Sequence, residues 1–301
     1  MHFRLRALEL VDIYLNHSPN PELIPSCVTS LVQALDISIK AGASKEPLVK
    51  RLKSTIGKIC TVKFKAEDHR MAKNVGTSVL ETLGGLLELA NTGSVIVTNL
   101  GPAYPRLTGA LLRLAQLWPD LSPDLGAIYE AGLESWLTRA TCLLPTAVFS
   151  LATSHHWPGC WTLAARLASS ALSKDVRQYR RVGALSVLAG IVNNKVFRQE
   201  HSDQILIIIK EILPKIADEL NKIEFVEKAK PKYLEELFNI LSNIQITDDT
   251  ADYKEAISKK LEVMAKSWPS NRAFALCKKQ LLRLLKNWNL KVDFSNKSLS
   301  N

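Results

Sequence analysis

The chain has 301 residues, more than a usual single-core domain, and this length favours two packed units or one elongated array. Hydrophobic residues make up 47% and charged residues 23%, a composition that excludes a largely disordered chain. The net charge of +10 predicts attraction to polyanions or acidic proteins over about 8 Å at physiological salt, although charge alone does not identify the partner.

The cysteines and the first residues indicate the compartment. The five cysteines are scattered and include no C-x-x-C pair, so they predict neither a disulfide framework nor a zinc knuckle, and a reducing compartment fits best. The first residues do not resemble a signal peptide, because Glu9 and Asp12 interrupt their apolar pattern. No run of about 18 uninterrupted apolar residues occurs. We therefore expect a nuclear or cytosolic protein without a membrane partner.

Apolar residues recur at spacings of three and four along almost the whole chain, while alternating, strand-like runs are nearly absent. An apolar stripe from Ile205 to Ile223, with Lys210 and Lys215 on the opposite face, predicts one clear amphipathic helix. The same spacing predicts further helices over residues 3–16, 22–41, 46–64, 70–91, 104–117, 124–139, 143–155, 160–172, 176–193, 229–244, 251–267 and 270–289.

Short connectors rich in Pro, Gly, Ser and Asn separate these segments, so successive helices are expected to pack antiparallel. The pattern predicts an all-α, HEAT/armadillo-like helical solenoid of antiparallel helix pairs, with a compact helical domain as the alternative. Trp-Pro recurs at Trp118, Trp157 and Trp268, and the first interval matches a repeat of about 40 residues. We expect one helical repeat unit over 1–190, a second over 195–290 and a polar tail over 291–301.

The first basic segment covers residues 45–65. At about 100° per residue, Leu48, Leu52, Ile56 and Ile59 share one face of a helix. Lys50, Lys53, Lys58 and Lys65 are predicted to project away from that face. Together with Arg51, they could contact phosphates of nucleic acid or an acidic partner. The alternative interpretation is an ordinary solvated outer face.

Two further basic groups lie later in the chain. The cluster Lys174, Arg177, Arg180 and Arg181 begins a helix, where positive charge is unfavourable, and this local cost favours a functional contact. In segment 270–289, an apolar stripe is formed by Phe274, Cys277, Leu281, Leu284 and Trp288. Its opposite side carries Lys279, Arg283 and Lys286. This last helix either caps a solenoid or contacts nucleic acid or an acidic partner.

No residue pattern predicts catalysis. Asp248, Asp249 and Asp252 form the one dense acidic group, but they follow Thr247 in a connector where helix capping is the simpler role. His155, His156 and Cys160 supply too few ligands for a structural zinc ion. No Gly-rich phosphate loop occurs, and the tryptophans fit packing between helices. We therefore expect a non-enzymatic protein with no cofactor, metal or small-molecule substrate.

Two stretches carry a resemblance to a known family. Residues 3–11 (FRLRALELV), followed by Pro19 and Pro21 and then by an apolar helix, form the first. Residues 135–139 (SWLTR) and 144–151 (LPTAVFSL), with His155 after them, form the second. In order and spacing these stretches resemble the carboxy-terminal part of the Myb-binding protein 1A and DNA polymerase V family, over about residues 3–245.

The resemblance implies a nucleolar helical-repeat protein of ribosomal RNA gene transcription, ribosome biogenesis and transcriptional regulation, without polymerase activity. Its implied partners are transcription regulators and ribosome-assembly proteins, with direct contact to DNA or RNA through the basic residues as a further prediction. Family members are longer, so the chain is expected to be a carboxy-terminal portion. The alternative is a cytosolic HEAT-type protein-interaction adaptor or transport factor, which salt-sensitive binding to DNA or RNA would distinguish.

Overall fold

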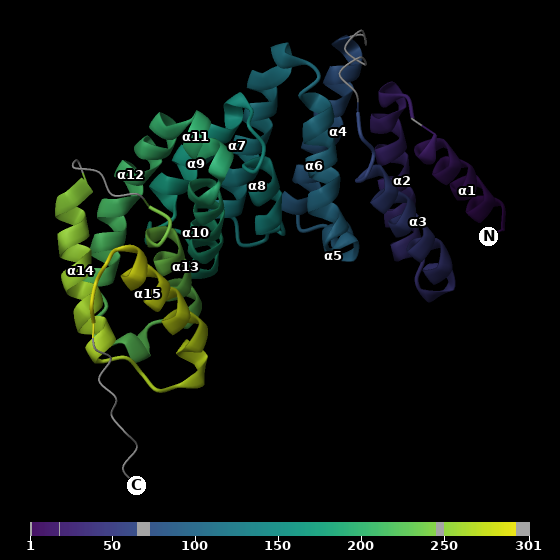
Figure 1. Cartoon of the computed structure of the whole chain (residues 1–301). Coiled ribbons are helices and arrows are strands. Elements are labelled where there is room, and N and C mark those ends of the chain that lie inside the picture. The colour runs from purple at the N-terminus through teal and green to yellow at the C-terminus, as the bar shows by residue number, and fades with distance from the viewer. Residues whose placement is uncertain (1, 18, 65–72, 245–249, 293–301) are drawn as a thin grey trace. The chain divides into compact units, whose positions relative to one another are not determined.

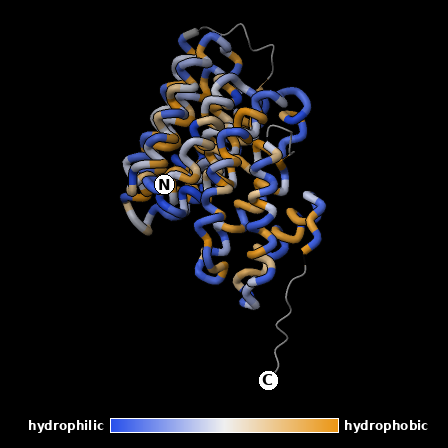
Figure 2. Tube along the Cα trace, turned by 90° about the vertical axis from the view of Figure 1, so that its left-hand side faces the viewer, coloured by the Kyte–Doolittle hydropathy of each residue, from blue (hydrophilic) through white to orange (hydrophobic). Residues whose placement is uncertain are grey.

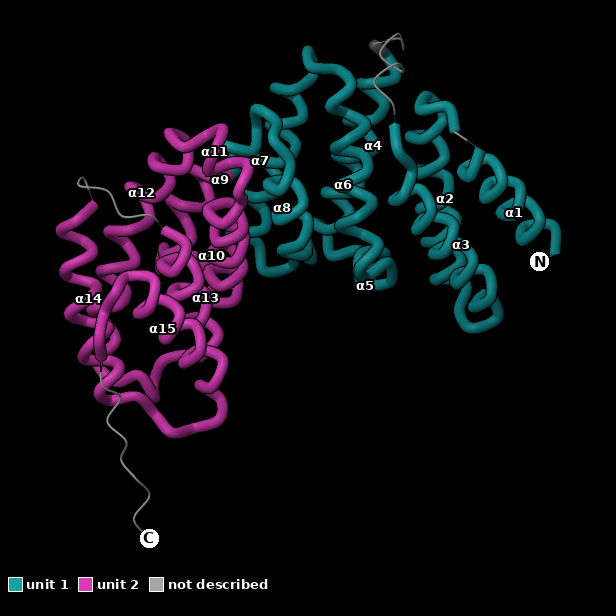
Figure 3. The backbone as a smooth tube through the Cα atoms, in the orientation of Figure 1, with its two compact units in different colours: residues 1–163 teal, residues 164–301 magenta. Residues whose placement is uncertain are grey.

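The fold was obtained as a computed structural model that describes residues 2–17, 19–64, 73–244 and 250–292 (Figure 1). All regular secondary structure within these ranges is helical, in fifteen α-helices joined by short connectors and 3₁₀ turns. The all-α, helical-repeat prediction is therefore confirmed. By the contacts between Cα atoms, the chain divides into two compact units, Met1–Leu163 and Ala164–Asn301 (Figure 3).

The first unit is a double layer of helices. Helix α3 packs against α1 and α6, and α6 packs against α8, while α2, α4 and α7 form the second layer. The two layers meet where α2 packs on α3 and α4 packs on α6. Its helices are α1 (His2–Asn16), α2 (Ile24–Lys40), α3 (Glu46–Ile59), α4 (Lys73–Asn91), α5 (Val95–Leu100), α6 (Ala103–Ala115), α7 (Ser122–Thr138) and α8 (Thr146–Ala152).

The second unit repeats this arrangement. Helices α10, α13 and α15 pack in sequence as one row, and α12 packs on α14 in another. Its helices are α10 (Gln178–Asn193), α11 (Lys195–Glu200), α12 (Ser202–Asn221), α13 (Pro231–Leu241), α14 (Ala251–Lys266) and α15 (Ala275–Asn287), and α9 (Pro158–Ser170) contains the division between the units. The sequence-based boundary near residues 190–195 lies inside this second unit, where α10 ends and α11 begins. Most of the predicted polar tail, 293–301, lies outside the described residues.

The apolar stripes read from the sequence become the cores of the units. On α12, Ile205, Ile208, Ile212 and Ile216 are all buried, as the spacing predicts. Figure 2 shows the corresponding alternation of hydrophobic and hydrophilic residues along the helices. In the first unit, the hydroxyl of Tyr104 on α6 donates to the carbonyl oxygen of Leu86 on α4 at 2.6 Å. That bond satisfies a fully buried phenol and ties two neighbouring helices together.

Periodicity predicts all of the longer helices but neither α5 nor α11, each of which has six residues. Such short helices contain fewer than two turns and cannot display a repeating apolar face. Their signal is at the start of each helix. Ser94 accepts from the Ile96 amide, and the Asn194 side chain accepts from the amides of Val196 and Phe197.

One stretch of the described chain, Pro21–Lys40, is long and apolar enough to cross a membrane by length and composition alone. The core helix of a soluble protein satisfies the same criterion. Here the helical part of the stretch, α2, buries Ile24, Val28, Leu31 and Leu35 within the first unit. The burial of these residues between helices accounts for the hydrophobicity of α2.

Candidate partner-binding surfaces

The first predicted basic face lies on α3, and its apolar side is placed as the sequence indicates. Leu48, Leu52, Ile56 and Ile59 are buried. Its basic side is less exposed than predicted, because helix α1 packs along it. Lys50 is exposed, whereas Arg51, Lys53 and Lys58 are only partly exposed, and Lys65 lies outside the described residues.

Two of these cations converge on a buried carboxylate of α1. The Nη2 atom of Arg51 lies 2.5 Å from Oδ2 of Asp12, and Nζ of Lys58 lies 2.9 Å from the same oxygen. The Asp12 side chain is 5% exposed, while those of Arg51 and Lys58 are 35% exposed. The contacts are ion pairs and not well-directed hydrogen bonds, because their geometry does not direct donor hydrogens at the Asp12 oxygens. Arg51 and Lys58 therefore join α3 to α1.

Lys53 is also engaged within the first unit. Its ammonium group donates to Oδ1 of Asn99 on α5 at 3.2 Å. Lys53 and Lys58 thus each reach a neighbouring helix and are only partly exposed, and their contact with nucleic acid or an acidic partner stays a prediction. The sequence carried one overlooked signal, since Asp12 occupies the buried face of α1 between Leu8 and Leu15. A carboxylate at such a position requires a partner of opposite charge.

The second predicted cluster, at the start of α10, divides into exposed and inward-turned residues. Lys174 and Arg177 are exposed, Arg180 is buried, and Arg181 is intermediate. The guanidinium of Arg181 lies 5.7 Å from the ring centre of Tyr233 on α13 and 3.9 Å from the carboxylate of Glu219 on α12. Arg181 thus joins three helices of the second unit.

Arg180 packs over its neighbour Tyr179, with its guanidinium carbon 4.8 Å from the ring centre. Burial acts to raise the pKa of Tyr179, but hydrogen bonds with Arg180 and Arg177 outweigh it, and the pKa is lowered. Of the four residues predicted to make a functional contact, Lys174 and Arg177 are therefore the ones that reach the surface, while Arg180 and Arg181 are turned into the unit. Helices α12 and α13 provide the acidic and aromatic groups that hold Arg181 inward.

The third basic group remains on the surface. Lys279, Arg283 and Lys286 are all exposed on α15 and lie within about 60° of one another around the helix axis. Arg283 also donates to Oδ1 of Asn243 at 3.3 Å, which fixes its direction. Phe274, Cys277, Leu281, Leu284 and Trp288 are buried on the opposite side, as predicted. We call Lys279, Arg283 and Lys286 the α15 ridge.

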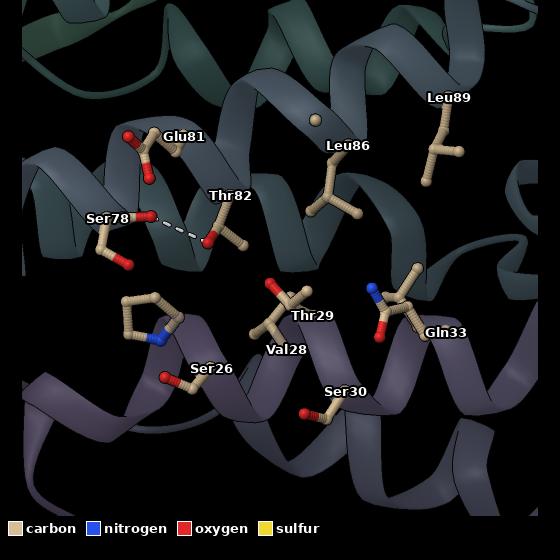
Figure 4. A pocket seen from close by; sticks show the side chains of 13 residues that line it. Ser26, Val28, Thr29, Ser30, Gln33, Ser78, Glu81, Thr82, Leu86 and Leu89 are labelled. Atoms are coloured by element: carbon tan, nitrogen blue, oxygen red, sulfur yellow. Dashed lines mark hydrogen bonds between the residues drawn. The ribbon is translucent and has the colours of Figure 1, made fainter.

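A groove with a volume of about 640 Å³ lies between α2 and α4. Figure 4 shows hydroxyl groups of both helices facing it, including those of Ser26 and Thr29. The hydroxyl of Thr82 donates to the carbonyl oxygen of Ser78 at 2.8 Å, a bond within α4. Glu81 is the one ionisable residue in its lining. The groove combines hydroxyl groups with apolar side chains and carries one negative charge, unlike the basic chain as a whole.

The other residues considered for chemistry form no reactive constellation in the part of the chain that the structure describes. No group of three or more His, Cys, Asp or Glu side chains there is arranged to hold a metal ion. Cys160 is buried, which raises its thiol pKa to about 12. Asp248 and Asp249 lie outside the described residues, and Asp252 is in the first turn of α14.

The tryptophans that the structure buries pack between helices, as predicted. Trp136 lies 5.3 Å from Phe149 between ring centres, and Trp157 lies 5.7 Å from Tyr129. The indole nitrogen of Trp157 donates to the carbonyl oxygen of Ala152 at 2.7 Å. These rings are therefore structural and are not exposed platforms for stacking bases.

Layered helix pairs with basic and polar outer faces define a helical-repeat scaffold. Residues 18–286 match the family described as Myb-binding protein 1A-like, TPR repeats, and the chain belongs to this family. TPR repeats, like HEAT repeats, are built from helix pairs, so the family description agrees with the observed architecture.

Myb-binding protein 1A of Drosophila melanogaster is 24% identical to the chain over 301 aligned residues. The alignment covers 93% of this chain and 25% of the relative, so the chain spans about a quarter of that protein's length. No solved structure matches the chain.

Proposed function

We propose that the chain is part of a nuclear, nucleolar scaffold that holds transcription regulators and ribosome-assembly proteins during ribosomal RNA synthesis. The family match over residues 18–286 carries the proposal. The name of the Drosophila relative describes binding to Myb, a transcription regulator, which supports partners of that class here. The helical-repeat architecture supplies extended helix faces suited to binding proteins.

The location and the partners are tested together in cells. A fluorescently tagged chain and its longer parent, if one is expressed, are expected in the nucleolus, and affinity purification is expected to recover ribosome-assembly proteins and ribosomal DNA. Cytosolic location together with recovery of transport factors would contradict the proposal and favour the HEAT-type adaptor. Recovery after nuclease treatment separates protein contacts from contacts through nucleic acid.

Direct contact with nucleic acid is assigned to the α15 ridge, with Lys174, Arg177 and Lys50 as additional exposed cations. Each phosphate contact contributes about 0.9 to the slope of log affinity against log salt for duplex DNA. The double variant Lys279→Gln, Lys286→Gln is expected to reduce the magnitude of that slope by about 1.8. Fluorescence anisotropy with a labelled duplex at several salt concentrations measures it.

A matched control removes the same charge elsewhere. Lys40 and Lys259 are exposed and each pairs with an acidic neighbour at 2.6 Å. The double variant Lys40→Gln, Lys259→Gln has the same net charge as the ridge variant and is expected to change the slope much less. Equal effects of the two variants would mean that general charge, and not the ridge, attracts the duplex.

A further inference from the structure

An open apolar groove lies between α1 and α2 of the first unit. Helix α1 packs mainly on α3, and the groove is lined by residues of α1, α2 and α3. The groove has a volume of about 350 Å³. Its base is formed by the buried residues Leu8, Leu31, Leu48 and Leu52 from three helices. It is distinct from the hydroxyl-lined groove on the α4 side of α2.

Large apolar side chains are exposed along the edges of this groove. Phe3 on α1 is 84% exposed and Ile37 on α2 is 63% exposed, and both line it. Leu10, also exposed, extends the apolar surface along α1. Exposed large apolar residues beside a hollow indicate a binding surface.

The dimensions of the groove fit one face of an α-helix. Its lining on α1 extends from Phe3 to Val11, about 12 Å at 1.5 Å per residue. Two turns of a partner helix have about the same length and present apolar anchors at positions i, i+4 and i+7. An apolar floor between two diverging helices is the geometry that binds an amphipathic helix by its apolar face.

The charges around the groove indicate which charge a bound partner should carry. Arg4 is the one charged residue in its lining, and it is exposed. Glu9 faces away, because two residues from Ala7 correspond to about 200° around α1. Asp36 on α2 is already paired with Lys40 at 2.6 Å.

Lys45 adds to this positive charge, because it directly precedes α3, whose residues Leu48 and Leu52 line the floor of the groove. Glu46 and Lys50 are each two residues from Leu48, about 200° around α3, and face away from the groove. The carboxylate of Asp12 is buried under two cations and offers no negative charge to the surface. A partner helix that carries Asp or Glu beside its apolar anchors therefore complements the edge of the groove. A second copy of the chain would bring Arg4 close to its own counterpart across a two-fold axis, which like charges oppose.

We propose that the groove between α1 and α2 binds an acidic amphipathic α-helix of a partner protein. The apolar face of that helix lies over Leu31 and Leu52, and its carboxylates lie beside Arg4. The inference rests on the proposed role as a protein-binding scaffold and specifies one surface and one chemistry for that role.

The test uses the full chain and a fluorescein-labelled, 18-residue helical peptide with leucine at i, i+4 and i+7 and glutamate at the flanking positions. A second peptide has lysine at each glutamate position. Anisotropy is expected to detect binding of the glutamate peptide and weaker binding of the lysine peptide. Ile37→Glu is expected to raise the Kd for the glutamate peptide by about tenfold or more.

Ile207→Glu is the matched control, because Ile207 is 57% exposed on α12, outside the groove. It is expected to leave the Kd unchanged. Arg4→Glu is expected to weaken binding of the glutamate peptide and strengthen binding of the lysine peptide, a reversal that damage to the fold would not produce. Circular dichroism verifies that all three variants keep their helical content.

Several results would overturn the proposal: failure of the glutamate peptide to bind, equal affinity for both peptides, or an unchanged Kd in Ile37→Glu. The proposal would also be overturned if sedimentation showed that the chain is a dimer and that Ile37→Glu dissociates it, because the groove would then bind a second copy. Nucleolar location with no peptide binding would refute the groove alone. Cytosolic location with the expected peptide binding would refute the nucleolar role alone.

Discussion

The buried carboxylate of Asp12 gives the sharpest prediction about stability. Asp12→Asn keeps the shape of the side chain and removes the charge that Arg51 and Lys58 share. Removing one partner of a fully buried ion pair costs about 3–5 kcal/mol, whereas exposed pairs contribute about 0.2–1 kcal/mol. Asp12 is buried, but its two partners are about one-third exposed. We therefore expect an intermediate loss of about 2 kcal/mol in the free energy of unfolding of this region.

Hydrogen exchange measured by mass spectrometry resolves the effect locally, which matters because the chain divides into two units. A loss of about 2 kcal/mol corresponds to exchange about 30-fold faster in peptides from α1 and α3. Asp36→Asn is the control, because its partner Lys40 is largely exposed, and exchange should change less than about threefold.

Replacing all three charged residues tests whether unpaired charge causes the loss of stability. A triple variant, Asp12→Leu with Arg51→Met and Lys58→Met, leaves no unpaired charge and is expected to recover most of the lost protection. Unchanged exchange in α1 and α3 of Asp12→Asn would refute the assignment of these ion pairs to stability. A triple variant that exchanges faster than Asp12→Asn would show that packing, and not charge pairing, is responsible.

Three further predictions concern single residues. A Cβ atom at Gly159 would overlap the buried indole of Trp157, so Gly159→Ala should lower the free energy of unfolding by about 1–3 kcal/mol in urea titration. Burial raises the thiol pKa of Cys160 to about 12, so maleimide at pH 8 should modify the half-buried Cys27 well before Cys160, and equal rates would contradict this. Burial acts to raise the pKa of Glu219, but its hydrogen bonds with Lys222 and Tyr233 outweigh burial and lower the pKa below the usual glutamate value. Its contribution to stability is therefore present above the usual glutamate pKa and is lost as the pH falls through the lowered one. The stability difference between the natural chain and Glu219→Gln should narrow in urea titrations as the pH falls through that range.

The α15 ridge shows where sequence reasoning about the direction of side chains succeeds. A helix of 13 residues has enough turns to separate an apolar face from a basic one, so local spacing alone places Lys279 and Lys286 opposite Leu281. The same spacing gives the correct buried face of α3. The grooves beside α2 carry no such local signal, because each requires residues from helices that only packing brings together.

The sequence by itself determined that the chain is helical, where its longer helices lie and which faces of α3, α12 and α15 are buried, because these properties depend on residues within about 20 positions of one another. Only the tertiary structure decided which cations reach solvent. Arg51 and Lys58 are drawn to Asp12, about 40 residues earlier in the chain, and Arg181 to Glu219, a similar distance later. The helical period fixes the direction of a side chain from its own axis, but exposure and charge pairing depend on the helix that packs against it.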